Sequence, residues 1–147
     1  MKIASWNINS LKVRLPQLLQ WLQSESPDVI GLQETKILDD NFPTADIEAA
    51  GYHVVFAGQK TYNGVAVLSR RDTTTAATDI ITDFPGLDDP QRRVLGATIG
   101  DLRFLDIYVP NGSEVGSDKY DYKLGWLETC TTYVETQLRE HERFAVV

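Results

Sequence analysis

The chain has 147 residues, 42% of them hydrophobic and 24% charged, a net charge of −7 and a single cysteine, Cys130. This size and composition are typical of one globular domain, and they exclude an intrachain disulfide and a general basic coat for nucleic acid, although not a local basic cleft. No apolar run reaches the roughly 18 residues of a membrane span, and no signal peptide is evident. We therefore expect no membrane partner and a cytoplasmic location.

The first part of the chain predicts a strand, a helix and a second strand. Residues 2–9 alternate between apolar and polar, which predicts a strand, although Asn7 and Asn9 at its end also fit a turn. Regularly spaced leucines then predict an amphipathic helix, in whose first turn Pro16 fits. The apolar residues 29–32 predict a buried strand, so the three elements resemble a βαβ unit.

The rest of the chain predicts a mixed β-sheet with flanking helices. A loop with a short helix is expected at residues 39–50. Closely spaced strands, whose short links indicate antiparallel neighbours, are expected at residues 52–57, 64–69, 75–82, 93–99 and 103–109. A long helix is expected at residues 117–142 and a last strand from residue 143. One face of the long helix is expected to carry Leu124, Leu127, Val134 and Leu138, with Trp126 and Tyr133 beside it. The fold class is therefore α/β or α+β.

The predicted strand at residues 29–32 ends in a polar tip made of Gln33, Glu34, Thr35 and Lys36. In open α/β sheets, ligands bind just beyond the carboxyl ends of strands. A carboxylate there, with a cation two residues further on, suits a metal ion bound against a phosphate. A glutamate after an apolar strand is also common in solvated loops, so this interpretation depends on the other strand ends.

Polar side chains recur after several other predicted strands. They are Asn7 and Asn9, then Lys60, Tyr62 and Asn63, then Arg92 and Arg93, and finally Tyr108, Asn111 and Lys119. Each group alone also fits a solvated surface or a half-buried strand residue. Together they offer a carboxylate for Mg²⁺, amides and a phenol for phosphate oxygens, and cations on flanking loops. This combination predicts phosphodiester chemistry.

Five motifs, in order along essentially the whole chain, resemble the exonuclease III family of abasic-site DNA endonucleases, part of the endonuclease/exonuclease/phosphatase superfamily. They are KIASWNINSL (residues 2–11), PDVIGLQETK (27–36), YNGVAVLS (62–69), QRRV (91–94) and IYVPNG (107–112). The resemblance implies a four-layer α/β sandwich. It also implies a DNA-repair hydrolase that uses Mg²⁺, or alternatively Mn²⁺, to cleave phosphodiester bonds at abasic sites and 3′ ends of duplex DNA.

The resemblance also implies roles for individual residues. Glu34 matches a metal ligand, Asn7 matches the asparagine beside the metal and the scissile phosphate, and Tyr108 matches the active-site tyrosine. Asn9 stands where some members have an aspartate, which leaves a second metal open. The positions that match DNA-binding residues are Lys12, Lys36, Tyr62, Asn63, Arg93 and Asn111.

By the same resemblance, residues 1–147 form the N-terminal part of a single domain that is truncated before the family's second half. Residues 144–147 resemble the strand that leads into the family's Gly-Asp-Phe-Asn-type motif, whose aspartate activates water in the family. We therefore expect mostly one sheet with an exposed inner face, and little activity from this chain alone.

Two alternatives stay open. One is a phosphoesterase of the same superfamily that acts on an inositol phosphate, a lipid headgroup or RNA; the motifs QETK (33–36) and YVPN (108–111) favour the DNA-repair branch instead. The other is a non-catalytic fragment that needs the missing C-terminal half or a second copy of itself as a partner.

Overall fold

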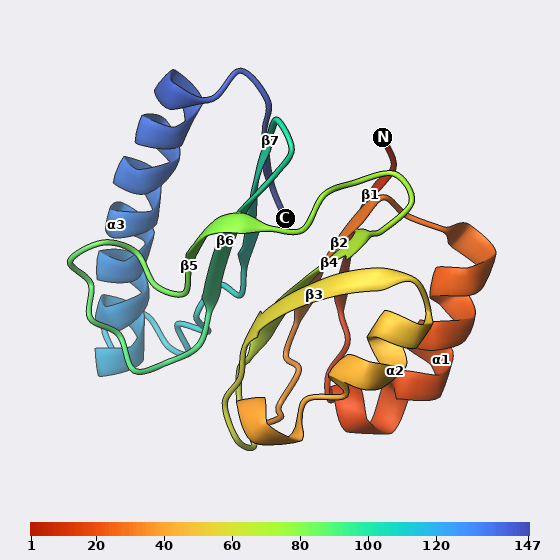
Figure 1. The fold of residues 1–147 in the computed structure, drawn as a ribbon. Coiled ribbons are helices and arrows are strands. Elements are labelled where there is room, and N and C mark those ends of the chain that lie inside the picture. The colour runs from red at the N-terminus through yellow and green to blue at the C-terminus, as the bar shows by residue number, and fades with distance from the viewer.

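The computed structural model describes all 147 residues and contains two four-stranded sheets with helices on their outer sides (Figure 1). The strands are β1 (Ile3–Asn7), β2 (Val29–Gln33), β3 (Tyr52–Ala57), β4 (Val65–Arg70), β5 (Thr78–Ile81), β6 (Val94–Ile99), β7 (Leu102–Ile107) and β8 (Phe144–Val146). The helices are α1 (Leu11–Glu25), α2 (Thr44–Ala49) and α3 (Asp118–Glu140), with one turn of 3₁₀ helix, η1 (Asp39–Asn41). None of the helices is long and apolar enough to span a membrane.

Both sheets are mixed. The first has the order β1-β2-β4-β3, and the parallel strands β1 and β2 are joined by α1. The second has the order β5-β6-β7-β8, and its parallel pair, β7 and β8, is joined by α3. All other neighbours are antiparallel. The predicted βαβ unit and the mixed α/β class are confirmed.

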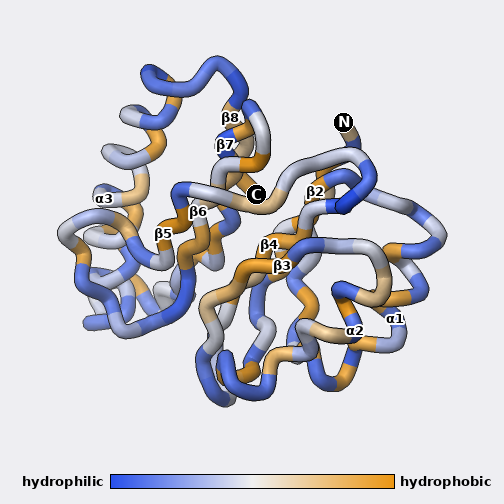
Figure 2. The backbone as a smooth tube through the Cα atoms, in the orientation of Figure 1, coloured by the Kyte–Doolittle hydropathy of each residue, from blue (hydrophilic) through white to orange (hydrophobic).

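Three apolar clusters hold four layers together, because alternate residues of a strand face opposite sides of its sheet. Ile30 of β2 packs toward α1 and α2, whereas its neighbour Val29 packs against the second sheet. Phe104 of β7 likewise faces the first sheet, and Leu105 faces α3. Figure 2 shows hydrophobic residues gathered along the strands. The order of layers is helices, sheet, sheet, helix (Figure 1).

The expectation of mostly one sheet with an exposed inner face is wrong. After β4 the chain crosses to a second sheet, and the inner faces of the two sheets cover each other. The physical reason lies in β4, where the four residues Val65, Ala66, Val67 and Leu68 are all buried. A strand that is apolar on both faces needs cover on both faces.

The expected buried face of α3 is also wrong in part. Leu124 and Leu138 are 47% and 62% exposed, whereas Trp126 and Cys130 are buried against the second sheet. The Trp126 ring lies 5.2 Å from that of Phe84. Burying the large indole removes more apolar surface from water than burying either leucine. The helix is therefore rotated about its axis so that Trp126 faces the sheet.

Helix α1 begins earlier than expected, so Pro16 lies inside the helix rather than in its first turn. The first amides of α1 are bound by the polar tip that follows β2. Ser10 N–H donates to the Glu34 carbonyl at 2.8 Å, and Leu11 N–H donates to the Thr35 carbonyl at 3.0 Å. The start of α1 and the tip of β2 therefore hold each other in place.

The packing of α3 predicts a contrast between two variants. Trp126→Ala should lower the free energy of unfolding by about 3–5 kcal/mol, because it empties a buried site. Leu138→Ala should change it by no more than about 0.5 kcal/mol, because the leucine is exposed. Urea unfolding measures both values, and a larger loss for Leu138→Ala would place the opposite face of α3 against the sheet.

Candidate active site

Three strand ends meet at one edge of the two sheets and bring the predicted catalytic residues together. Asn7 ends β1 and lies opposite Gln33, the last residue of the parallel strand β2. Glu34 follows directly, so its side chain and that of Asn7 are neighbours. Tyr108 follows β7 of the second sheet and approaches the same carboxylate. Residues 7, 34 and 108 of the sequence thus form one site.

A closed ring of hydrogen bonds surrounds Glu34. Asn7 Nδ2 donates to Glu34 Oε1 at 2.8 Å, and Lys36 Nζ pairs with Glu34 Oε2 at 2.8 Å. Lys36 Nζ also donates to Asn9 Oδ1 at 2.6 Å. The ring closes where Asn9 N–H donates to Asn7 Oδ1 at 3.2 Å. Glu34 and Lys36 each contact two other side chains of the ring, and Asn9 joins it through both its side chain and its backbone N–H.

The backbone around the ring adopts an uncommon conformation. Asn9, Glu34 and Lys36 have φ of 44°, 55° and 54°, in the left-handed region that non-glycine residues seldom occupy. The hydrogen bonds from Ser10 and Leu11 to the tip of β2 hold this segment in place. Such conformations persist only where the surrounding structure enforces them, and they cluster at functional sites.

The surroundings of the ring widen the gap between the pKa values of Glu34 and Tyr108. Burial alone would raise the pKa of Glu34, but hydrogen bonds from Lys36, Asn7 and Tyr108 outweigh it and hold that pKa below its usual value. For Tyr108, burial and then the neighbouring Glu34 carboxylate raise the pKa above its ordinary value. At neutral pH the site therefore contains an ionised carboxylate beside a neutral phenol.

Arg93 packs on Tyr108 from the second sheet. Its guanidinium lies 4.9 Å from the centre of the Tyr108 ring, within the range of a cation–π interaction. Arg93 Nη1 also donates to the Tyr108 carbonyl at 3.2 Å, and Nε donates to Gln91 Oε1 at 2.9 Å. Arg93 thus supports the phenol, and its expected contact with DNA stays a prediction.

The other predicted DNA-binding residues differ in exposure. Tyr62 is 68% exposed, and Asn111 is exposed with its Oδ1 accepting from Ser113 N–H at 2.9 Å. Asn63 is buried, and its amide donates to Gln59 and Gln91. Asn63 therefore links two loops, and its expected contact with DNA also stays a prediction.

A recess of about 560 Å³ opens beside the ring and is positively charged. Its eight lining residues include three lysines and no acidic residue; they are Lys12, Leu15, Lys36, Ile37, Leu38, Asn41, Pro43 and Lys60. Lys12 comes from the first turn of α1, and Lys36 also belongs to the ring. The chain has a net charge of −7, so this recess is the local basic cleft that its overall charge does not reveal.

The oxygen donors of the ring fit part of a Mg²⁺ shell. Mg²⁺ is typically bound through one or two carboxylates, with waters and substrate phosphates completing the octahedron. Glu34 supplies one ionised carboxylate. Asn7 turns its Nδ2 toward that carboxylate and its Oδ1 toward Asn9 N–H, so its amide would have to turn over to offer an oxygen to the ion. No group of three or more His, Cys, Asp or Glu side chains gathers anywhere in the chain. The residues therefore fit an ion that takes most of its ligands from water and substrate.

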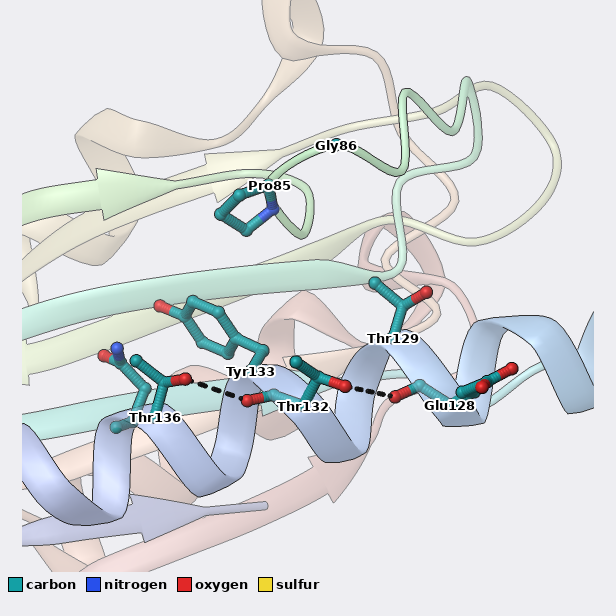
Figure 3. Close-up of a pocket in the computed structure, with 8 residues that line it drawn as sticks. Pro85, Gly86, Glu128, Thr129, Thr132, Tyr133 and Thr136 are labelled. Carbon is teal, nitrogen blue, oxygen red and sulfur yellow. Dashed lines mark hydrogen bonds between the residues drawn. The ribbon is translucent and has the colours of Figure 1, made fainter.

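A second groove, of about 590 Å³, lies between α3 and the loop at Pro85 and Gly86 (Figure 3). It contains none of the predicted site residues. Hydroxyls of its threonines are used within the helix, since Thr132 donates to the Glu128 carbonyl at 3.2 Å and Thr136 to the Thr132 carbonyl at 3.0 Å. We assign the candidate site to the strand ends.

Sequence reasoning missed one polar residue that lies close to the site, Asp106. It is fully buried on the inner face of β7 and accepts a hydrogen bond from Gln33. The sequence does contain a sign of this burial. Asp106 is an acidic residue on the same face of β7 as the apolar Leu102 and Phe104. Burial of a carboxyl group requires a specific partner.

Comparisons with known proteins agree with this geometry. A profile described as the Endonuclease/Exonuclease/phosphatase family matches residues 4–146. The chain is 35% identical to the exodeoxyribonuclease III of Haemophilus influenzae over 97% of its own length and 53% of the relative's. The chain therefore spans about half the length of this curated relative.

Solved structures give the same result. A Neisseria 3′ phosphatase, NExo, bound to a product DNA hairpin superposes with a TM-score of 0.93 at 42% identity, over 99% of this chain and 56% of that one. An AP endonuclease from Archaeoglobus fulgidus gives a TM-score of 0.86 at 38% identity, over 92% and 51% of the two chains.

The hydrogen bonds of the ring should lower the titration midpoint of Glu34. Its carboxyl carbon, followed by NMR, should titrate below the usual range, and Lys36→Met should move the midpoint upward because it removes a hydrogen bond to the ionised form. Lys12→Met is the matched control and should leave the midpoint unchanged. Because the folded pKa is the lower one, ionised Glu34 stabilises the fold at neutral pH, and this contribution is lost as pH falls through the folded pKa. An unshifted midpoint in Lys36→Met would contradict the ring.

Proposed function

Because the chain belongs to the Endonuclease/Exonuclease/phosphatase family, we propose that it carries part of the active site of a DNA-repair nuclease of the exodeoxyribonuclease III type. The proposed reaction is Mg²⁺-dependent hydrolysis of phosphodiester bonds at abasic sites and 3′ ends of duplex DNA. The observation that carries this proposal is the ring in which Asn7 and Lys36 hold the Glu34 carboxylate at a strand end.

The proposed chemistry assigns a role to each group of the site. Glu34 and Asn7 would hold Mg²⁺, and Mn²⁺ fits the same oxygen donors. The bound ion would neutralise charge on a phosphate during in-line displacement. Tyr108 stays neutral at working pH and can donate its hydroxyl proton in a hydrogen bond to a phosphate oxygen without adding repulsion. Arg93 keeps the phenol in place.

The lysine-lined recess supports a nucleic-acid substrate over a small phosphate ester. A DNA backbone carries regularly spaced phosphates, and a cleft that follows it needs cations beyond the reacting centre. Lys12 and Lys60 line the recess together with Lys36, which belongs to the ring. The exposed Tyr62 lies two residues after Lys60, where an aromatic ring can contact a sugar or base.

The isolated chain is proposed to be a weak nuclease. The contacts of Glu34 are an amide, an ammonium group and a phenol, and none of these is a general base for water at neutral pH. A positioned acid–base group contributes about 10²–10⁴-fold to such reactions. The expected partnership with the rest of the family's domain, or with a second copy, stays a prediction.

The recess predicts a salt-dependent contribution of Lys60 to DNA binding. Lys60→Ala should weaken binding of duplex DNA and reduce the slope of log K against log salt by about 0.9, the value for one lost phosphate contact. Lys2→Ala is the matched control, because Lys2 pairs with Glu25 and does not line the recess. Fluorescence anisotropy from low to moderate salt gives both slopes. Equal slopes for Lys60→Ala and the unmodified chain would show that the recess is not part of the DNA-binding site.

The proposed reaction predicts weak, Mg²⁺-dependent incision of a duplex that carries one abasic site. Glu34→Gln should abolish the incision, because the amide cannot replace the carboxylate as a metal ligand. A phosphoinositide serves as the control substrate and should not be hydrolysed. Gel analysis of end-labelled DNA gives the rates. Equal incision by Glu34→Gln, preference for the phosphoinositide, or neither binding nor incision of DNA would each contradict the proposal.

A further inference from the structure

We propose that Asp106 is a positioning residue: its hydrogen bond with Gln33 fixes the strand end that carries Glu34 against the strand end that carries Tyr108. The consequence for DNA rests on the proposed function, whereas the structural role does not. Asp106 contacts no group of the ring itself and acts through Gln33.

This hydrogen bond joins the two sheets next to the residues of the site. Gln33 Nε2 donates to Asp106 Oδ1 at 2.5 Å, from β2 of the first sheet to β7 of the second. Among hydrogen bonds between two side chains, no other joins a strand of one sheet to a strand of the other. Gln33 directly precedes Glu34, and Asp106 stands two residues before Tyr108. The bond therefore joins the end of β2, just before Glu34, to the end of β7, just before Tyr108.

The opposite strand is shaped to admit Asp106. Gly31 of β2 faces the carboxyl group, and a Cβ placed on Gly31 would lie 2.9 Å from both Cγ and Oδ1 of Asp106. The same Cβ would lie 2.7 Å from Val147 Cγ2. A side chain at position 31 would push the carboxyl group away from Gln33, so the missing Cβ allows the sheets to approach here.

The polar character of Asp106 is unexpected in its surroundings. The layer between the sheets is mostly apolar, with Val29, Leu95 and Phe104 among its buried members. Asp106 is fully buried there, so the carboxyl group is costly where it stands. An apolar side chain would fill this position at less cost. A polar pair kept in such a layer fixes one arrangement of the two sheets.

The chemistry of the pair makes asparagine a close substitute. Burial raises the pKa of Asp106 well above its usual value, and hydrogen bonds from Gln33 and from the backbone of Ala66 and Leu32 offset this only in part. An asparagine keeps an oxygen in the place of Oδ1, which can accept the same hydrogen bond from Gln33. Gln33 Nε2 also donates to Ser5 Oγ at 3.1 Å, so the link continues to β1, which carries Asn7.

Amide hydrogen exchange on the whole chain tests the role without relying on catalysis. In Asp106→Leu, the amides of Ser10 and Tyr108 at the strand ends should exchange about tenfold faster relative to those in the middle of β4, as expected when one buried hydrogen bond is lost locally. Asp106→Asn should keep the protection of the unmodified chain. Val67→Ala, a packing change in the same layer, should accelerate all these amides alike.

Two results overturn the proposal: uniform acceleration in Asp106→Leu, or no acceleration at the strand ends. If Asp106→Leu does not fold, Gln33→Met removes the same hydrogen bond from the donor side and should give the same local pattern; unchanged protection of the strand ends in Gln33→Met overturns the proposal.

Incision of abasic DNA per folded molecule gives the functional readout. Asp106→Leu should incise at least about tenfold more slowly than the unmodified chain, since small misplacements of reacting groups are costly, while Asp106→Asn should keep its rate. Equal rates in Asp106→Leu and the unmodified chain overturn the catalytic consequence. If the unmodified chain neither binds nor incises DNA, the proposed function fails, and the exchange pattern alone decides the role of Asp106.

Discussion

Face-to-face packing of the two sheets determines where the groups of the site stand. Val29 and Val67 of the first sheet meet Leu95 and Phe104 of the second in a layer that excludes water. Burial of this apolar surface stabilises the fold, and it also brings the ends of β1, β2 and β7 to one edge. Without this contact, the carboxylate of one sheet and the phenol of the other would not lie together. The chemistry of the site therefore depends on the packing between the sheets.

At that edge, the surroundings move the pKa values of two neighbouring acids further apart. Donors from Asn7, Lys36 and Tyr108 lower the pKa of Glu34, whereas burial and the carboxylate beside it raise the pKa of Tyr108. Divergent pKa values in adjacent groups are a feature of active sites, because one group can then bind a cation while the other donates a proton in a hydrogen bond. The backbone of Glu34 is held in its left-handed conformation by the start of α1, where Ser10 N–H donates to the Glu34 carbonyl.

Much of the fold and the centre of the site could be predicted from sequence, for identifiable reasons. The buried strand before Glu34 is a local apolar run, and its polar tip follows directly, so no long-range information was needed. The second sheet was not predicted, because strand patterns do not show which strands share a sheet. The centre of the buried face of α3 lies at Trp126 rather than at the leucines, because the burial of Trp126 depends on Phe84, far away in sequence.

The outer part of the site shows the same limit. Asn63 was predicted from its motif, but its burial between Gln59 and Gln91 depends on two loops that only the fold brings together. The basic recess gathers Lys12, Lys36 and Lys60 from three segments, so composition gave no sign of it. A strand-end carboxylate is a pattern in the chain, whereas a charged recess is a property of the folded surface.

A divalent-metal site at the Glu34 ring should bind Mn²⁺ in solution. Paramagnetic broadening of NMR signals by Mn²⁺ added to the whole chain, with Glu34→Gln as the comparison, tests this binding. We expect broadening at low Mn²⁺ to centre on Asn7 and Glu34 and to disappear in Glu34→Gln. Broadening centred on another acidic segment, or broadening at the strand ends that persists in Glu34→Gln, would contradict it.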